Sequence, residues 1–509
     1  MKHGSWLRAA VCAAGLACQA FGAEDAPKKS TPEGGKAKDE TAEKLAVTTN
    51  QVTIGGAKLN YTARAGTLFL RDRENKPTAE IFFIAYTLNG FEDLSRRPVT
   101  FSFNGGPGSS SVWMHLGLLG PRRVALAPDG GAVPPPYKLL NNEFSLLDQT
   151  DLVFIDPVST GFSRAVKPDD ARQFYGVEED SRAIADFIRL YVTRHGRWGS
   201  PKFLIGESYG TTRAAVLTAE LRQRHRMNLN GIMLVSTVLN FQTLSFAAGN
   251  DLAYVLFLPA YTATAWHHKK LPDPWQAKPL AATLAAAEEF ALGDYQAALL
   301  RGASLPAEPR RQVVQKLAAF TGLAPEFLDR SNLRVSMGRF ASELLRSENR
   351  VVGRFDSRYT GLVRDREANQ APYDPSFEAV VSAFASTFNH YVRAELGYES
   401  DQPYETLAGV GPWNWGASNT YLNVAESLAD SLTKNPFLKV HVSCGYYDLA
   451  TPYFAARHTF NHLGVDPQLL KNITLDYYTA GHMMYLNTPD LEKQKRDLAH
   501  FIKSALAGP

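Results

Sequence analysis

The 509-residue sequence contains only three cysteines, and two of them, Cys12 and Cys18, lie within the first 23 residues. If that leader is removed, Cys444 is the one cysteine left, which excludes an internal disulfide. Small secreted folds that depend on several disulfides are therefore excluded. A chain of this length can instead be stabilised by an ordinary apolar core.

Long apolar runs and a strong net charge are also missing. After the leader, no apolar stretch is long enough to cross a bilayer, so no transmembrane segment is predicted. The net charge is +3, and no basic stripe interleaved with aromatic residues occurs, so nucleic acid is not a predicted partner. His267 and His268 have no carboxylate or cysteine at ligand spacing, and no metal site is predicted.

The N-terminus has the pattern of an export signal. A positive start is followed by a short apolar run over residues 9–21 and by the small pair Gly22-Ala23. We therefore expect residues 1–23 to be a signal peptide and the mature protein to be periplasmic or secreted. Cys18 resembles a lipoprotein attachment site, but Gly15 stands where leucine is usual, which makes anchoring the less favoured outcome. Export without disulfides is more typical of a bacterial protein than of a eukaryotic one.

Composition and periodicity divide the rest of the chain. Residues 24–46 are polar and charged, which predicts a flexible linker. Residues 47–239 begin with an antiparallel meander, predicted as strands at 51–54, 59–63, 67–71 and 80–88. They continue in a βα rhythm, with strands predicted at 98–103, 151–155, 203–205 and 231–238. Residues 240–435 show helical stretches, a long polar loop over 350–374 and no strand pattern. Strands return in residues 436–509, so we predict an α/β fold interrupted by a helical cap.

Ser208 lies in the pentapeptide Gly206-Glu207-Ser208-Tyr209-Gly210, between an apolar strand and a helical segment. A strand, G-x-S-x-G and a helix form a nucleophile elbow, in which glycines permit a sharp turn that exposes the serine hydroxyl. A tight turn with an ordinary serine would give the same pentapeptide. Residues elsewhere in the chain have to distinguish a nucleophilic serine from an ordinary one.

A serine nucleophile needs a base, and the base needs an orienting acid. In α/β-hydrolases these follow the serine in the order acid, then histidine, at the ends of later strands. Strand 438–444 leads to Asp448, and strand 473–478 leads to His482. These two residues are therefore the candidates for the acid and the base.

A second glycine-rich loop, Asn104-Gly105-Gly106-Pro107-Gly108, follows the predicted strand 98–103. It lacks the Gly-Lys-Ser/Thr of a phosphate-binding loop. It suits an oxyanion hole, because its backbone N–H groups can face an oxygen that gains charge. The N–H of Tyr209, just after the serine, would be the second donor.

With these motifs in this order, the chain resembles a bacterial-type member of the serine carboxypeptidases, an α/β-hydrolase family with a mostly parallel central sheet. The predicted meander would form an N-terminal antiparallel extension, and the helical insertion fits the family's cap by its position in the chain. The resemblance implies a Ser208 nucleophile, a His482 base and an Asp448 acid, with an oxyanion hole from Gly106 and Tyr209. It also implies that Asn104, Gly105 and Glu207 bind the C-terminal carboxylate of a peptide substrate. No cofactor is implied, and the sequence does not specify an oligomeric state.

One position departs from the family pattern. Well-studied members carry a second glutamate that shares a proton with the one before the serine, and this position is Leu118 here. Without that neighbour, the usual cause of a raised pKa at Glu207 is missing. An esterase or acyltransferase with the same chemistry therefore stays open as an alternative. A catalytically inactive binding protein on the same fold is a third alternative, which the complete set of triad and oxyanion residues does not support.

Overall fold

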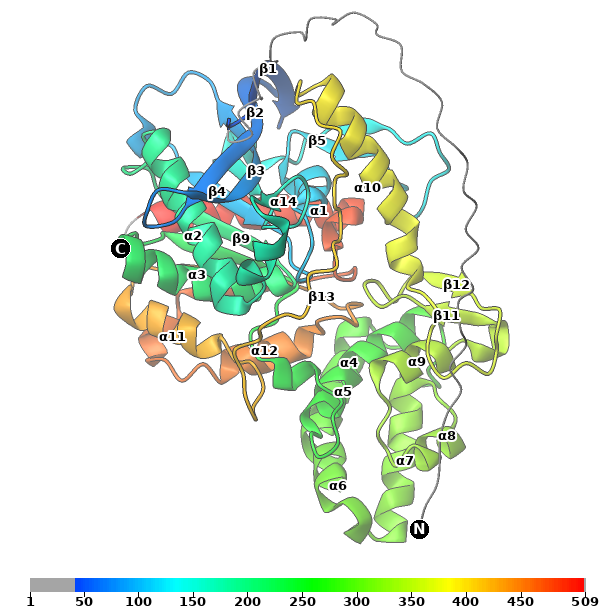
Figure 1. Cartoon of the computed structure of the whole chain (residues 1–509). Coiled ribbons are helices and arrows are strands. Elements are labelled where there is room, and N and C mark those ends of the chain that lie inside the picture. The colour runs from blue at the N-terminus through cyan, green and yellow to red at the C-terminus, as the bar shows by residue number, and fades with distance from the viewer. Residues whose placement is uncertain (1–41, 508–509) are drawn as a thin grey trace, which may run out of the picture. The chain divides into compact units, whose positions relative to one another are not determined.

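The computed structural model describes residues 42–507 (Figure 1). The predicted signal peptide, the lipoprotein alternative at Cys18 and nearly all of the predicted linker lie outside the described residues. Among the helices of residues 42–507, none is both long and apolar enough to span a membrane.

One ten-stranded sheet organises the described chain, in the order β1-β2-β3-β7-β4-β9-β10-β13-β14, with β8 paired to β3. The strands from β7 to β14 along this order run parallel, whereas β1, β2 and β3 are antiparallel. Their bounds are β1 Leu45–Ile54, β2 Ala57–Arg71, β3 Pro77–Leu88, β4 Val99–Phe103, β7 Asp151–Ile155, β8 Arg164–Ala165, β9 Lys202–Glu207, β10 Gly231–Val235, β13 Lys439–Gly445 and β14 Ile473–Tyr478.

The inner parallel strands are largely apolar on both faces because both faces are covered, whereas the edge strand β14 is only partly buried. Leu204 packs into the core on one side of the sheet, and its neighbours Phe203 and Ile205 pack into the core on the other side. Successive side chains of a strand point to opposite faces, so a strand covered on both sides reads as a continuous apolar run. This is why the short runs in the sequence predicted the parallel strands correctly.

Helices cover the two faces. In Figure 1, α2 (Val177–Arg194) and α3 (Tyr209–His225) lie on the near side of the sheet, and α14 (Thr488–Leu506) lies behind it. The short α1 (Val112–Met114) belongs to the same core as α14. The observed fold is thus the α/β-hydrolase type, with a mostly parallel central sheet.

The antiparallel extension differs from the prediction in one respect. Two strands were predicted for residues 59–63 and 67–71, but β2 runs without interruption through Gly66. Gly66 continues the strand because β1 and β3 flank it and pair with it on both sides. The chain entering β1 passes close to it, and a Cβ at Gly66 would lie 2.3 Å from the carbonyl oxygen of Lys44. The strand β1 accordingly starts at Leu45, within the range predicted as linker.

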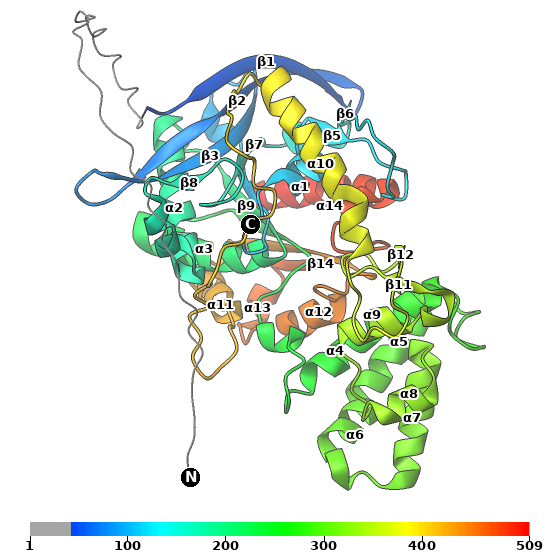
Figure 2. The same ribbon diagram turned by 45° about the vertical axis from the view of Figure 1, so that its right-hand side comes forward.

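The predicted insertion, residues 240–435, contains three helical parts. One group comprises α4 Leu252–His267, α5 Leu280–Phe290, α6 Gln296–Arg301, α7 Ala307–Thr321, α8 Pro325–Arg330 and α9 Met337–Glu343. Figure 2 shows α10 (Pro375–Ala394) leaving this group and running beside α1, where the rings of Trp113 and Phe384 lie 5.0 Å apart. The third part, α11 (Ala425–Lys434), packs against α3.

The expectation that this insertion contains no strand was wrong. The strands β11 (Arg350–Val352) and β12 (Thr360–Leu362) form a small antiparallel pair inside the predicted polar loop. Each strand is three residues long, which is too short to show an alternating pattern in the sequence. A similar short pair, β5 (Arg122–Val124) and β6 (Leu139–Asn141), lies on the hydrolase side.

Candidate active site

Ser208 lies at a sharp turn between β9 and α3. Its backbone angles, φ 59° and ψ −129°, are strained for a residue with a side chain. Two flanking glycines make the turn possible, because a Cβ at Gly206 would lie 2.2 Å from the carbonyl oxygen of Gly210. A Cβ at Gly210 would in turn lie 2.9 Å from the carbonyl oxygen of Phe103. The local geometry is that of the predicted nucleophile elbow.

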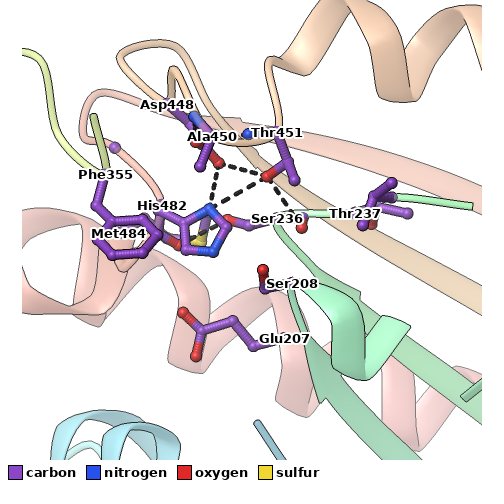
Figure 3. Close-up of polar contacts among 12 residues, drawn as sticks. Glu207, Ser208, Ser236, Thr237, Phe355, Asp448, Ala450, Thr451, His482 and Met484 are labelled. Carbon is purple, nitrogen blue, oxygen red and sulfur yellow. Dashed lines mark hydrogen bonds and ion pairs between the residues drawn. The ribbon is translucent and has the colours of Figure 1, made fainter. Parts of the chain in front are cut away.

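The structure brings His482 and Asp448 together from two different loops. The Nδ1–H of His482 donates to Oδ2 of Asp448 at 2.8 Å, and both side chains are buried. Figure 3 shows the Ser208 hydroxyl below the imidazole ring, on the side away from Asp448. Burial alone would lower the pKa of His482, but the Asp448 carboxylate and, to a lesser extent, Glu207 together hold that pKa above its usual value.

Asp448 is held by a complete set of donors. Its Oδ1 accepts from the backbone N–H groups of Ala450 (2.7 Å) and Thr451 (2.9 Å). Its Oδ2 accepts from the Thr451 hydroxyl at 2.7 Å as well as from His482. A buried carboxylate with all these hydrogen bonds is fixed in orientation, and it fixes the imidazole in turn.

The loop after β4 lies against the elbow. A Cβ at Gly105 would lie 2.5 Å from the backbone nitrogen of Tyr209, so only glycine permits this approach. Gly106 has φ 103°, a conformation that favours glycine. Tyr209 is the first residue of α3, and the first N–H groups of a helix have no acceptor within the helix. The two predicted oxyanion donors therefore belong to adjoining backbone segments.

Glu207 is buried beside these groups, with 2% of its surface exposed. Its Oε2 accepts hydrogen bonds from the Asn104 amide and, at 2.8 Å, from the Tyr485 hydroxyl. Burial raises the pKa of Glu207 to about 7. The sequence reasoning attributed a raised pKa in this family to a second carboxyl group. Here desolvation raises it without one, which the sequence could not show.

Leu118 is 1% exposed and belongs to the apolar core, so it takes no part in the polar network. Tyr485 provides the neighbouring polar contact to Glu207 instead. Its ring fits because residue 117 is glycine, where a Cβ would lie 2.5 Å from Cε2 of Tyr485. The sequence analysis missed Tyr485, and Gly117 beside Leu118 was the available signal.

Most of the predicted site residues line one cavity of about 390 Å³. They are Asn104, Gly105, Gly106, Glu207, Ser208 and His482. Tyr209 and Asp448 are buried behind its wall. The sequence analysis did not identify the other major contributors, Trp113, Arg354, Phe355, Phe377, Leu407, Ala408 and Met483. Within residues 42–507, no group of three His, Cys, Asp or Glu residues is arranged to hold a metal ion.

The fold and the Ser-Asp-His order define an α/β hydrolase. More particularly, a model of the family described as "Serine carboxypeptidase" matches residues 58–474, and the chain belongs to this family. The family was thus predicted correctly from the motifs.

Individual relatives share only part of their length with this chain. The pheromone-processing carboxypeptidase KEX1 of Saccharomyces cerevisiae is 34% identical over 145 residues, which are 27% of this chain and 19% of that protein. Serine carboxypeptidase-like 35 of Arabidopsis thaliana is 25% identical over 251 residues, 48% of each chain. This chain therefore spans less than half the length of the curated relatives that it matches.

Among solved structures, the prohormone-processing carboxypeptidase Kex1(delta)p of Saccharomyces cerevisiae matches with a TM-score of 0.54 and 18% identity. The match covers 87% of this chain and 91% of that one, and it supports the fold. These relatives are eukaryotic, so they do not confirm the bacterial type predicted from the leader and the cysteine count.

Proposed function

We propose that this protein is an exported serine carboxypeptidase that removes C-terminal residues from peptides. The observation that carries the proposal is the shared cavity. Ser208, His482 and the loop from Asn104 to Gly106 all line it, and Asp448 holds His482 from behind.

In the proposed mechanism, Oγ of Ser208 attacks the scissile carbonyl carbon while Nε2 of His482 takes the hydroxyl proton. The N–H groups of Gly106 and Tyr209 stabilise the negative oxygen of the tetrahedral intermediate. His482 then gives the proton to the leaving amine as the C–N bond breaks, which leaves an acyl-enzyme at Ser208. Water, deprotonated by His482, attacks the acyl carbon, and Ser208 regains its proton as the product acid leaves.

Recognition of the substrate carboxylate is assigned to Asn104, Gly105 and Glu207. A protonated Glu207 can donate a hydrogen bond to a carboxylate, whereas an ionised Glu207 repels it. Because the pKa of Glu207 is about 7, its change from protonated to ionised falls within the pH range in which the enzyme can be assayed.

The pH dependence follows from the sign of that shift. Glu207 is protonated below its pKa of about 7, so binding of a free carboxylate is favoured there and lost as the pH rises. We expect kcat/KM for a blocked dipeptide, divided by kcat/KM for its methyl ester, to fall about tenfold between about pH 6 and pH 8. Both substrates need His482 in its neutral form, so its titration changes both values of kcat/KM equally and cancels in the ratio. Glu207→Gln is the matched control and should give a flat ratio, because an amide donates at any pH.

Tyr485→Phe tests the contact that the sequence did not predict. Burial dominates the pKa of Glu207, but the hydrogen bond from Tyr485 lowers it. Removing the hydroxyl should therefore move the midpoint of the same ratio to higher pH, by up to about one pH unit. A midpoint that stays in place or moves to lower pH would contradict this role of Tyr485.

An esterase or acyltransferase is the second candidate, and Leu118 is the observation that favours it. By the resemblance, other members carry a glutamate at this position that helps to recognise the substrate carboxylate, and the apolar side chain of Leu118 cannot do so. A blocked dipeptide, its C-terminal amide and its ester distinguish the candidates. Equal rates of attack with and without the free carboxylate would favour the esterase.

Export and domain organisation are also proposals. We propose a signal peptide over residues 1–23, a linker over 24–46 whose last two residues already belong to β1, a hydrolase domain formed by 47–239 and 436–509, and a cap over 240–435. Mass spectrometry of the protein from a periplasmic or culture fraction would give the mature N-terminus. A first residue near Glu24 supports cleavage without lipid, and a lipid-modified Cys18 would overturn it.

A further inference from the structure

Arg354 is a cation at the candidate active site. Among the residues that line the cavity, it is the one arginine or lysine, and Glu207 is the one carboxyl group. The Arg354 side chain is exposed, and within residues 42–507 no acceptor hydrogen-bonds or ion-pairs with its guanidinium. Other arginines nearby are engaged: Arg358, for example, pairs with Asp356 at 2.6 Å. Arg354 is therefore available to a ligand.

The backbone that carries Arg354 is anchored to both catalytic loops. Its carbonyl accepts from the N–H of Leu449, next to Asp448, at 3.0 Å. The carbonyl of Phe355 accepts from the N–H of His482 at 2.5 Å. The N–H groups of Arg354 and Phe355 donate to the two oxygens of Asp374, at 3.0 and 3.2 Å. A fixed backbone with an unengaged side chain is suited to a ligand-binding residue.

Aromatic contacts place Arg354 on the side of the cavity where His482 lies. The guanidinium carbon lies 5.2 Å from the centre of the Phe355 ring. That ring lies 4.9 Å from the imidazole of His482. In the proposed mechanism His482 protonates the leaving amine, so the leaving residue has to lie on this side.

We propose that Arg354 binds a carboxylate of the leaving C-terminal residue. The inference rests on the proposed carboxypeptidase function and adds a specificity-determining residue to it. An arginine stays charged at every physiological pH, so it attracts a carboxylate without the protonation that Glu207 requires. Within residues 42–507 the nearby Asp374 carboxylate forms no ion pair with the Arg354 guanidinium, and its oxygens accept from backbone N–H groups and the Ser376 hydroxyl instead. Two carboxylates of a leaving residue fit this chemistry: the α-carboxylate, and the side chain of a terminal Asp or Glu.

The test compares Arg354→Gln and Arg354→Lys with the wild type. Arg350→Gln is the matched control, because it removes a charge from β11 without touching the cavity. Blocked dipeptides ending in Leu, Gln and Glu are assayed with the Leu-terminated amide. For the substrates whose carboxylate Arg354 binds, we expect Arg354→Gln to lower kcat/KM about tenfold to 100-fold, mainly through KM. Arg354→Lys should restore part of the lost kcat/KM. Arg350→Gln should leave all rates unchanged.

The substrates distinguish the two sources of the carboxylate. Binding of the α-carboxylate predicts an equal loss for the Leu, Gln and Glu acids and none for the amide. Binding of an acidic side chain predicts a loss confined to the Glu substrate. An equal loss for the acids and the amide, or no loss for any of them, would overturn the proposal.

A binding measurement separates this inference from the proposed function. A fluorophosphonate labels an activated serine whether or not peptides are substrates. Protection from labelling by N-acetyl-leucine and N-acetyl-glutamate is compared with protection by their amides. Protection by the acids that is weakened in Arg354→Gln supports the site even if the wild type releases no C-terminal residue. Protection that is the same in the wild type and Arg354→Gln refutes it.

Discussion

Replacing Ser208 with alanine is expected to lower kcat for peptide hydrolysis by about six orders of magnitude. The substitution removes the oxygen that forms the acyl-enzyme in the proposed mechanism and leaves the proposed oxyanion donors in place, so a small residual rate is expected. Folding should be unaffected, because within residues 42–507 no hydrogen bond of the Ser208 hydroxyl contributes to the structure. The expected result is therefore a folded protein without turnover.

Steady-state rates and thermal unfolding of the purified variant would be measured together. Ser431→Ala is the control, because Ser431 is a buried serine on α11 whose hydroxyl also has no partner within the described chain. It should keep wild-type rates. A Ser208→Ala variant with wild-type rates would show that the nucleophile is another residue. A wild-type protein that no fluorophosphonate labels would instead favour the inactive binding protein.

Replacing Arg213 with alanine is expected to lower the free energy of unfolding by about 3–5 kcal/mol. Arg213 is 1% exposed on α3, and its Nε donates to Oδ2 of buried Asp180 at 2.7 Å. Burial raises the pKa of Asp180, and Arg213 opposes that rise. Without the arginine, a carboxyl group remains buried with its charge uncompensated, which is the costly way to break such a pair.

The same arginine supports the candidate active site. Its Nη1 donates to the carbonyl oxygen of Asn104 at 2.6 Å, and its guanidinium lies 5.2 Å from the ring centre of Tyr209. It thereby connects the loop after β4 to the helix after Ser208. We expect a lower kcat as well as lower stability, because the proposed oxyanion donors lose a common support.

Urea denaturation would measure the stability change. Arg222→Ala is the control on the same helix, since Arg222 forms a partly exposed ion pair with Asp430 at 2.9 Å and should cost about 1 kcal/mol or less. The double variant Arg213→Ala with Asp180→Ala should be more stable than Arg213→Ala alone, because the unpaired carboxyl group is gone. Equal stability of Arg213→Ala and Arg222→Ala would refute the argument from burial.

Local patterns in the sequence were sufficient for the sheet and the motifs. The apolar runs that became β4, β7, β9, β10 and β13 were recognisable because these parallel strands are buried on both faces. The edge strand β14 is only partly buried. The elbow glycines were recognisable because the turn excludes a Cβ at both positions. Since strand ends meet at one edge of such a sheet, the sequence also indicated that Asp448 and His482 lie near Ser208.

The insertion was less predictable. Its helices were recognised, but nothing in their periodicity showed that α10 and α11 pack on the hydrolase side rather than with α4 to α9. Amphipathic helices need an apolar partner without specifying which one. The two short strands beside Arg354 depend on pairing with each other, so they too had no local signal.

The sequence by itself determined the family, the α/β-hydrolase fold and the candidate residues Ser208, Asp448 and His482. Each of these depends on residues close together in the chain or on a known strand order. Only the tertiary structure decided the surroundings of Glu207 and the position of Arg354. Tyr485 reaches Glu207 from a distant part of the chain, and burial raises the pKa of that carboxyl group. Burial and long-range contacts arise from packing, and no local pattern of residues encodes them.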